Sequence, residues 1–274
     1  MSVRNRSQGW QHAKLTGHRN EDLAAQLVRS DSAVQKRLLR CAHLEGVYVE
    51  DVEYGGLCET DVDCVLGGRT KSKTDLWLYL SNGKRLNVSI KKEDKGQVFL
   101  IGIERFIQGY ELQYQEEIPP EICRALSLYF GCAEDTLELV RSFGHLPDLE
   151  LRKHRLTAAT LNAYDPRLCT ALLRWVNGHI SQLFDFCFAR GLASNREDWA
   201  QIVWYVNLVG ESALDQMFYL PDLREIIPPT AFYGAKNCGS TIQLPFGFVQ
   251  WHSPRKVIPG SMQFHHSYAK LSQL

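Results

Sequence analysis

The stretch Lys73–Lys91, KTDLWLYLSNGKRLNVSIK, decides how the rest of the chain is interpreted. It holds two runs in which apolar and polar residues alternate, on either side of Ser81-Asn82-Gly83. Alternation with a period of two around a short polar loop predicts a β-hairpin. A three-residue loop in which Gly83 takes the positive-φ position fits these residues.

The loop length fixes which residues face one another across the hairpin. With three loop residues, Leu80 pairs with Lys84. Asp75 then falls opposite Ser89. A two-residue loop would place Asp75 opposite Ile90, among apolar side chains, so we expect the first register.

This register separates the side chains onto two faces. One face carries the apolar residues Leu76, Leu78, Leu80, Leu86, Val88 and Ile90. The other carries Lys73, Asp75, Trp77, Asn87, Ser89 and Lys91. On the second face Asp75 lies one diagonal position from Lys91, roughly 7 Å at the Cβ atoms. A carboxylate that holds a divalent cation beside an ammonium group that orients water suits metal-assisted phosphodiester hydrolysis. The alternative is an ordinary surface ion pair.

Composition predicts an ordinary globular protein. The chain has 274 residues, of which 45% are hydrophobic and 23% charged, enough for one large domain or two small ones. It has no run of 18 or more apolar residues, and its N-terminus lacks the apolar core of a signal peptide. We therefore expect a soluble, cytoplasmic protein without membrane contact. The eight cysteines lack metal-site spacing, which favours reduced thiols over a zinc site.

Charge is unevenly distributed although the net charge is zero. Residues 45–63 contain seven carboxylates and no Lys or Arg. Residues 226–274 contain no Asp or Glu, while four cations remain there: Lys236, Arg255, Lys256 and Lys270. An acid-free tail of this length suggests a surface that faces a polyanion.

Hydrophobic spacing predicts a helix over Leu15–Leu39, in two pieces, with Thr16 or Asn20 as its N-cap. Glu21 would then lie in the first turn. It either faces solvent, as acids at helix starts often do, or points into a cleft as a further metal-binding carboxylate.

The remaining chain predicts alternating strands and helices. Val98–Tyr110 fits a third strand or a short helix beside the hairpin, and Glu104 within it would supply a second carboxylate if the segment returns across the hairpin. The other expected elements are a strand in 46–66, a basic loop at 69–73, helices over Glu121–Phe143 and Leu168–Arg190, a polar linker at 147–155, a strand at 202–209 and short strands beyond 226.

Several of these residues together resemble a known family. The shared features, in matching order, are Gly67-Gly68, Lys73-Thr74-Asp75, Ser89-Ile90-Lys91, Arg174-Trp175 and Met262-Gln263-Phe264. In this order they resemble the type II restriction endonucleases of the PD-(D/E)xK superfamily. The resemblance implies an α/β (α+β) fold with a mixed central sheet flanked by helices. It also implies one domain with a catalytic core over 1–120, a helical part over 121–225 and a basic DNA-recognition tail over 226–274.

The resemblance implies Mg²⁺-dependent cleavage of double-stranded DNA. Asp75 would bind the metal ion, and Lys91 would position the attacking water. The position that usually holds an acid or amide is Ser89, a poorer ligand. In one group of these enzymes a Glu on the following helix compensates, which favours Glu104, with Glu21 or the Ser89 hydroxyl completing the set.

Recognition of DNA would fall to the tail and to the basic loop. Gln250 and Gln263 can pair with adenine, and Lys236, Arg255 and Lys256 with guanine or phosphate. His265 occupies the position at which the resembled family has a lysine. Lys71 and Lys73 would meet the phosphate backbone near the cut site.

The family resemblance also suggests a short, GC-rich target such as CCGG and a cognate DNA methyltransferase that protects the host. It leaves open whether the protein acts as a monomer or as a homodimer. Two alternatives remain: a non-catalytic DNA-binding protein, and a DNA-repair nuclease with the same core.

Overall fold

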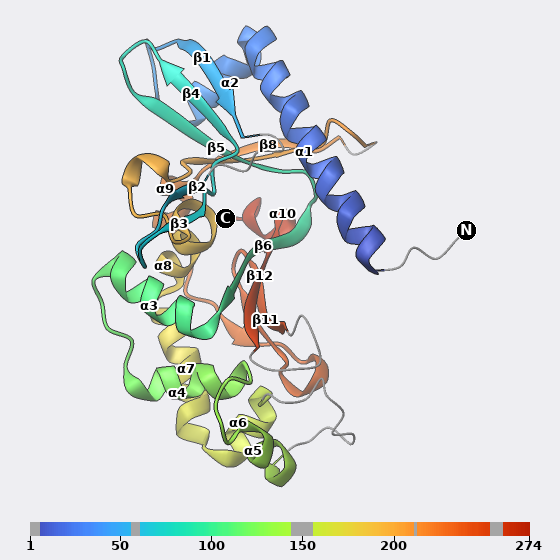
Figure 1. The fold of residues 1–274 in the computed structure, drawn as a ribbon, viewed down its shortest axis with the longest axis vertical. Helices are drawn as coiled ribbons and strands as arrows, with labels where there is room; N and C mark the ends of the chain where they lie inside the picture. The colour runs from blue at the N-terminus through green and yellow to red at the C-terminus, as the bar shows by residue number, and fades with distance from the viewer. Residues whose placement is uncertain (1–5, 56–60, 144–155, 211–212, 253–259) are drawn as a thin grey trace. The chain divides into compact units, whose positions relative to one another are not determined.

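The computed structural model forms two compact units, shown with their elements in Figure 1. The first comprises residues 1–94 and 188–223, and the second residues 95–187 and 224–274. The described parts of the chain are residues 6–55, 61–143, 156–210, 213–252 and 260–274, with side chains described from residue 15 onward.

The first unit is built on a five-stranded sheet in the order β1-β4-β5-β7-β8. Its strands are β1 (Val49–Tyr54), β4 (Leu76–Leu80), β5 (Arg85–Lys91), β7 (Ile202–Val206) and β8 (Asp215–Tyr219). Strands β5 and β7 are parallel, and the other neighbours are antiparallel. Parallel neighbours need a long crossover, and the chain between β5 and β7 includes residues 95–187, the first segment of the second unit. The expected mixed sheet is confirmed.

Helices α1 (Arg6–Ser30) and α2 (Ser32–Cys41) cover one face of this sheet (Figure 1). The helix predicted over Leu15–Leu39 therefore exists in two pieces, as expected. The predicted caps are wrong, because α1 already begins at Arg6 and both Thr16 and Asn20 lie inside it. Asp31 instead caps α2, accepting a hydrogen bond from the Ala33 N–H at 2.8 Å.

The hairpin has the predicted register. Leu76 pairs with Val88, and the Leu80 N–H donates to the Lys84 carbonyl at 2.9 Å. Gly83 has φ +74°, the positive value that the three-residue loop requires. The six apolar residues of the first face all lie in the core under α1 and α2. Alternation and loop chemistry therefore suffice to place both strands.

The second face of the hairpin is also covered, which the sequence did not indicate. Trp77, Asn87 and Ser89 are 5%, 2% and 2% exposed. The Asn87 amide donates to the carbonyls of Glu197, at 2.6 Å, and Trp199, at 2.9 Å. The segment around the short helix η2 (Arg196–Asp198) thus packs on this face. The polar residues of this face therefore do not form a freely solvated ion pair.

A small second hairpin precedes the main one. Strands β2 (Asp61–Asp63) and β3 (Arg69–Lys71) pair antiparallel around Gly67-Gly68, which have φ +84° and +69°. The stretch predicted as a basic loop at 69–73 is thus a strand over its first three residues. The strand expected within 46–66 is β1, and residues 56–60 lie outside the described chain.

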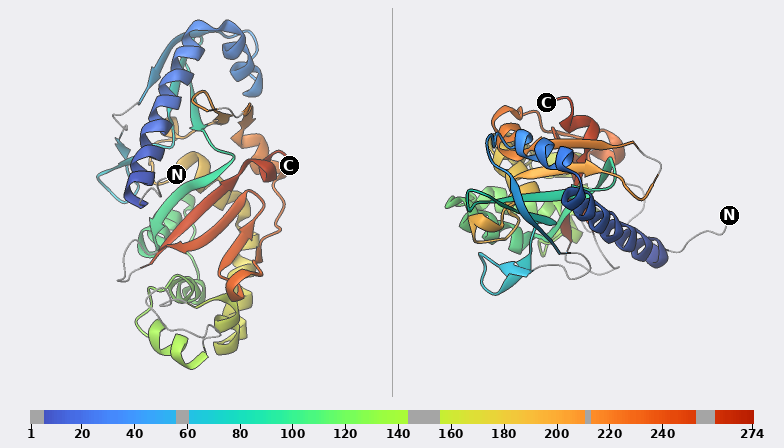
Figure 2. Two further views of the ribbon diagram at one scale, coloured as in Figure 1. Left: turned by 90° about the vertical axis from the view of Figure 1, so that its right-hand side faces the viewer. Right: turned by 90° about the horizontal axis from the view of Figure 1, so that it is seen from above.

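The second unit contains another five-stranded sheet, antiparallel throughout, in the order β6-β12-β11-β10-β9. Figure 2 shows these strands side by side. They are β6 (Lys95–Gly102), β9 (Phe232–Tyr233), β10 (Thr241–Leu244), β11 (Gly247–His252) and β12 (Ser261–Ser267). Strand β6 pairs with β12, so the expectation that this segment joins the hairpin is wrong.

Helices complete the second unit. They are α3 (Ile103–Tyr114), α4 (Pro120–Tyr129), α5 (Thr136–Phe143), α6 (Ala158–Tyr164), α7 (Pro166–Gly178), α8 (Ile180–Asp185), α10 (Tyr268–Leu271) and the short η3 (Lys236–Cys238). Two elements lie at the junctions of the units, the π-helix η1 (Phe186–Arg190) and α9 (Leu220–Ile226).

Two predicted helices are interrupted. The one over Glu121–Phe143 is α4 and α5, because Gly131 adopts φ +74° and ends the first. The one over Leu168–Arg190 is α7, α8 and η1, broken at His179, where φ is −120°. The linker expected at 147–155 lies outside the described residues. Among the described helices, none combines the length and apolar character needed to cross a membrane.

Candidate active site

The site is organised by Asp75, which lies directly before β4. Its Oδ2 accepts a hydrogen bond from the Ile90 N–H at 2.6 Å and another from the Ser89 hydroxyl at 3.2 Å. Both bonds follow from the register of the hairpin. Because they use one oxygen, Oδ1 makes no hydrogen bond to the described chain and stays available to a ligand.

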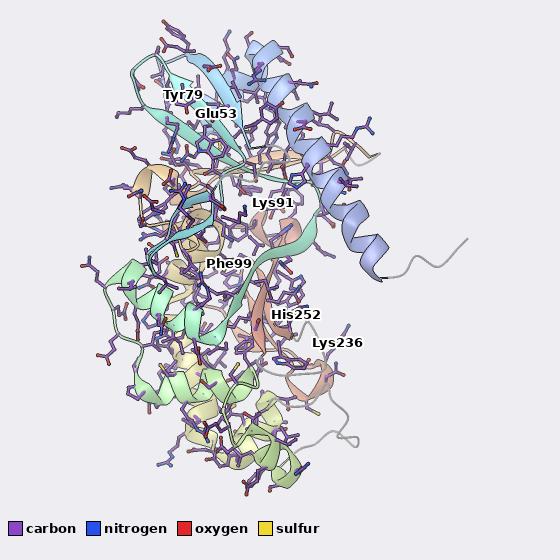
Figure 3. The ribbon with its side chains drawn as sticks, in the orientation of Figure 1. Glu53, Tyr79, Lys91, Phe99, Lys236 and His252 are labelled. Atoms are coloured by element: carbon purple, nitrogen blue, oxygen red, sulfur yellow. The ribbon has the colours of Figure 1, made fainter. Side chains whose placement is uncertain are left out.

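Lys91 ends β5 and points back toward the same group, with its place labelled in Figure 3. Its Nζ donates to the Ser89 Oγ at 2.7 Å and to the Ile90 carbonyl at 3.1 Å. The Ser89 hydroxyl therefore accepts from Lys91 and donates to Asp75. A serine at this position links the ammonium group to the carboxylate because its hydroxyl both accepts and donates a hydrogen bond. An ionised carboxylate there could accept from Lys91 but could not donate to Asp75.

Glu21 joins the group from α1. Burial and, next, the negative charge of Asp75 raise its pKa to about 7, while a hydrogen bond from His18 and the charges of His18 and Lys91 act in the opposite direction. These effects require the Glu21 carboxyl to lie near Asp75 and Lys91. The Glu21 side chain is 20% exposed, and its role as a metal-binding carboxylate stays a prediction.

Contacts along α1 fix the position of Glu21. Asn20 is fully buried; its amide donates to the Val206 carbonyl at 2.9 Å and accepts from the Leu208 N–H at 2.7 Å. One turn earlier, the Lys92 ammonium donates to the Thr16 hydroxyl at 3.0 Å. Glu21 follows Asn20 directly, so the bonds to the end of β7 set the direction of its side chain.

The donor set suits a magnesium ion. Two nearby carboxylates repel one another, and a cation between them relieves that repulsion. Mg²⁺ is commonly held by one or two carboxylates, with water and substrate phosphate completing its shell. No group of three or more His, Cys, Asp or Glu in the described chain could hold a metal ion. The carboxylate oxygens of Asp75 and Glu21 are ligands of the kind that Mg²⁺ prefers.

Glu104, the other predicted ligand, lies in the second unit. It is exposed, in the first turn of α3. The strand before it does not return across the hairpin, so the route by which we expected it to approach Asp75 is absent. Its role as a ligand stays a prediction.

Some cations of the basic stretch, which is predicted to contact phosphate, form ion pairs within the protein. Arg69 pairs with Asp63 at 2.6 Å, and Lys71 with Asp61 at 2.8 Å, both on the exposed β2–β3 hairpin. The acid-rich segment therefore neutralises part of the basic one. Lys73 is half-buried beside Gly191. Whether Lys71 and Lys73 contact DNA stays a prediction.

The predicted base-contacting residues share one face of the second sheet. The Gln250 Nε2 donates to the Gln263 Oε1 at 2.9 Å and lies 3.1 Å from the His265 Nε2. Gln263 in turn donates to the Gln97 Oε1 at 2.7 Å. The His265 ring stacks on Phe248, 4.4 Å between centroids. Burial, then the charge of His252, lowers the pKa of His265, which favours a neutral ring.

The cations of the tail differ in their environments. Lys236 is exposed in η3 (Figure 3), as a phosphate-binding residue must be. Lys270 is turned inward, where its Nζ donates to the carbonyls of Leu244 and Gly247, both at 2.8 Å. Burial lowers its pKa. Arg255 and Lys256 lie outside the described residues, and their DNA contacts stay predictions.

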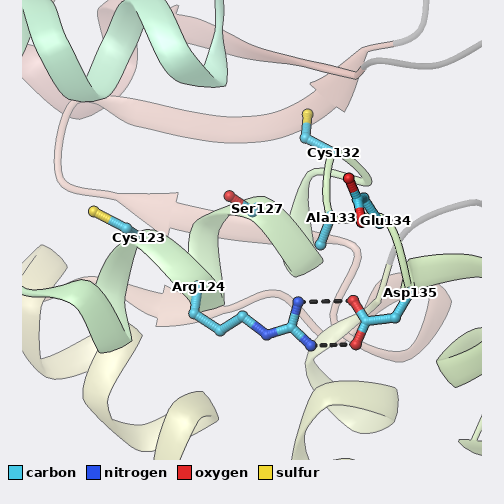
Figure 4. Close-up of a pocket in the computed structure, with 7 residues that line it drawn as sticks. All are labelled: Cys123, Arg124, Ser127, Cys132, Ala133, Glu134 and Asp135. Atoms are coloured by element: carbon cyan, nitrogen blue, oxygen red, sulfur yellow. Dashed lines mark hydrogen bonds and ion pairs between the residues drawn. The ribbon is translucent and has the colours of Figure 1, made fainter.

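The second unit also has a shallow pocket of about 480 Å³, shown in Figure 4. Arg124 and Asp135 form a bidentate ion pair across it, with one bond of 2.7 Å. Burial raises the pKa of the pocket thiols Cys123 and Cys132, which makes them poor nucleophiles at neutral pH. None of the seven cysteines in the described chain forms a disulfide.

Sequence reasoning missed three residues of these groups. His18 stands three positions before Glu21, a helical spacing that does signal contact. Gln97 lies on β6, and only knowledge of the pairing with β12 would place it beside Gln263. Asn20 carries no sequence signal of its own, because a buried asparagine in a helix resembles an exposed one.

Comparisons with known proteins find a similarity among solved structures. No protein-family model matches the chain, and no curated protein shows a significant match. Among solved structures, the chain is similar to the restriction endonuclease MspI in complex with its cognate DNA. The TM-score is 0.46 and the sequence identity 13%, over 85% of this chain and 77% of that chain. A similarity of this size does not assign an activity.

Proposed function

We propose that this chain is a Mg²⁺-dependent deoxyribonuclease that hydrolyses phosphodiester bonds in double-stranded DNA at specific sites, as type II restriction endonucleases do. The observation that carries the proposal is the convergence of Glu21, Asp75, Ser89 and Lys91 at the end of one hairpin. Oxygen ligands for a divalent cation and an ammonium group for a developing negative charge are the parts that this hydrolysis needs.

Each residue has a distinct role in the proposed reaction. Asp75 and Glu21 would hold the cation, each with one oxygen that makes no hydrogen bond to the described residues. A bound Mg²⁺ supplies charge neutralisation at the scissile phosphate and makes water more acidic. Lys91 directs a water molecule toward the phosphorus and stabilises the charge that develops on the phosphate oxygens.

In this proposal the main role of Ser89 is to position Lys91, and binding the cation is secondary. Its hydroxyl accepts from Nζ at 2.7 Å, and this bond holds the ammonium group next to Asp75. The Ile90 carbonyl, 3.1 Å from the same Nζ, supplies a second restraint. The Lys91 ammonium group has three N–H donors, and two make these bonds. The third remains for water or phosphate.

Sequence recognition is assigned to the face of the second sheet that carries Gln250, Gln263 and His265. The amide and imidazole groups there form a connected network, which fixes the direction of each donor and acceptor before DNA binds. Bidentate amides suit adenine. Lys236, Arg255 and Lys256 would contact phosphate or guanine, and Lys71 and Lys73 the backbone near the cut site. The target is proposed to be short.

An enzyme of this kind would act in the cytoplasm beside a cognate DNA methyltransferase, and it would cut both strands either as a homodimer or by two successive cuts. We also propose that residues 1–274 act as a single domain. Glu104 is proposed as a further metal ligand.

Incubation of the purified protein with a long double-stranded DNA of known sequence tests the proposal. We expect discrete fragments with Mg²⁺ and intact DNA with EDTA, and sequencing of the fragment ends gives the target. A continuous smear would favour a repair nuclease. Retarded DNA without any cleavage, over a range of metals and salt, would favour a non-catalytic DNA-binding protein.

A further inference from the structure

We propose that His18 is a positioning residue that holds the Glu21 carboxylate in the orientation that binds the cation. The inference rests on the proposed function, since it assigns a new role within the same site. His18 is not part of the resemblance to restriction endonucleases, and no chemistry is asked of it beyond one hydrogen bond.

The geometry of α1 brings the two side chains together. His18 and Glu21 are three positions apart, which places them on adjacent turns of one helix face. The His18 Nδ1 lies 3.1 Å from the Glu21 Oε2. Both groups are withdrawn from water, with side-chain exposures of 9% and 20%. A hydrogen bond sheltered from water in this way restricts the carboxylate more than an exposed one.

The surroundings of His18 decide which ring nitrogen carries the proton. Its Nε2 is buried and has no hydrogen-bond partner in the described chain. An N–H at Nε2 would be a buried donor without an acceptor, and the Nδ1 lone pair would then face the Glu21 carboxylate. A proton at Nδ1 removes the contact between that lone pair and the carboxylate. His18 therefore donates to Glu21.

This bond gives the two carboxylate oxygens of Glu21 different roles. Oε2 is held by His18, and Oε1 makes no hydrogen bond to the described residues. Asp75 shows the same division, with Oδ2 held by Ile90 and Ser89. Each carboxylate thus keeps one oxygen fixed by the protein and offers the other to a ligand. Partners that orient metal-binding groups typically change metal affinity or activity about 10- to 100-fold when removed.

Three substitutions separate a directional hydrogen bond from simple packing. In His18→Asn the amide nitrogen can occupy the place of Nδ1 and still donate to Glu21. In His18→Gln the amide lies nearer the place of Nε2, and His18→Leu has no donor. The probe is Mn²⁺ without DNA, with the free ion measured by electron paramagnetic resonance. DNA cleavage and thermal unfolding are recorded for every variant.

We expect His18→Leu and His18→Gln to raise the dissociation constant for Mn²⁺ about tenfold or more, and His18→Asn to stay within about threefold of the native protein. In a Glu21→Gln background, His18→Leu should cause no further loss, because the two residues act as a unit. Equal losses for His18→Asn and His18→Leu, or a His18→Leu effect that persists in the Glu21→Gln background, would overturn the proposal.

The same experiment distinguishes this proposal from the proposed function. If the native protein binds Mn²⁺ and cuts DNA but Glu21→Gln leaves both unchanged, Glu21 is not a ligand and only the role of His18 fails. If the native protein neither binds the ion nor cuts DNA, the nuclease function fails and the role of His18 with it.

Discussion

Burial and, next, the negative charge of Asp75 raise the pKa of Glu21, although Asp75 precedes strand β4 and Glu21 lies in α1. Two carboxyl groups placed this close are unfavourable without a cation. The bonds that hold them there are made by the protein itself: Asn20 fixes the helix, and the Ile90 N–H fixes Asp75. The fold thus maintains a repulsion that a divalent cation would relieve.

The first prediction concerns which glutamate is the second ligand. We expect Glu21→Gln to weaken Mg²⁺-dependent cleavage at least about tenfold, as loss of a metal-supporting group typically does. Glu104→Gln, at an exposed position of α3, should have a smaller effect. Single-turnover cleavage at several Mg²⁺ concentrations makes the comparison. The opposite ranking of the two variants would return Glu104 to the role that the sequence suggested.

The second prediction concerns stability and pH in the absence of metal. The folded-state pKa of Glu21 is raised to about 7 from 4.5, so folding favours its protonated form. The resulting stabilisation is complete below about pH 4.5 and is lost as the pH rises to about 7. The free energy of unfolding of the native protein, minus that of Glu21→Gln, should therefore fall by roughly 3 kcal/mol over this interval.

Urea unfolding at a series of pH values, with EDTA present, measures this difference. Saturating Mg²⁺ should reduce the fall, because a bound cation favours the ionised carboxylate. A difference that stays flat from pH 4.5 to 7 would show that the carboxyl is not held near Asp75.

The third prediction concerns the anchor of α1. Asn20→Ala leaves the Val206 carbonyl and the Leu208 N–H without their partner, and each such buried group costs about 1–3 kcal/mol. We expect a lower free energy of unfolding together with weaker Mg²⁺ dependence of cleavage. Arg19→Ala, at the exposed neighbouring position, is the matched control and should change neither. Equal behaviour of the two variants would show that the anchor does not position Glu21.

The fourth prediction concerns recognition. Gln263→Leu removes the centre of the network that links Gln97 and Gln250. We expect loss of discrimination between the target and sites that differ by one base pair, by about 1–3 kcal/mol at that position. Gln26→Leu, an exposed glutamine of α1, serves as the control. Unchanged discrimination by Gln263→Leu in competition cleavage would move recognition to another surface.

The hairpin could be predicted because its information is local. Alternation assigned the two faces, and Ser81-Asn82-Gly83 limited the loop to one length, so the position of Asp75 opposite Ser89 followed. The bond between the Ser89 hydroxyl and Asp75 is a direct consequence of that register. The division of Leu15–Leu39 into two helices was equally local, because Asp31 is a preferred N-cap residue.

The features that could not be predicted depend on partners distant in the sequence. The apolar run Val98–Tyr110 left a strand or a short helix open, and it does not reveal that β6 pairs with β12. The second face of the hairpin carries polar residues, yet Asn87 is buried because Glu197 and Trp199 offer carbonyls to it. Lys270 contributed to the basic character of the tail, but it binds carbonyl groups in the interior.

The most direct test compares binding and cleavage in Asp75→Asn and Lys91→Ala, with Glu50→Gln and Lys84→Ala as controls at exposed positions of the same unit. DNA binding is measured by fluorescence anisotropy with Ca²⁺ and cleavage under single-turnover conditions with Mg²⁺. We predict that the first two variants still bind DNA but lose cleavage, while both controls retain it. Cleavage by Asp75→Asn and Lys91→Ala at the native rate would contradict the assignment of this hairpin as the active site.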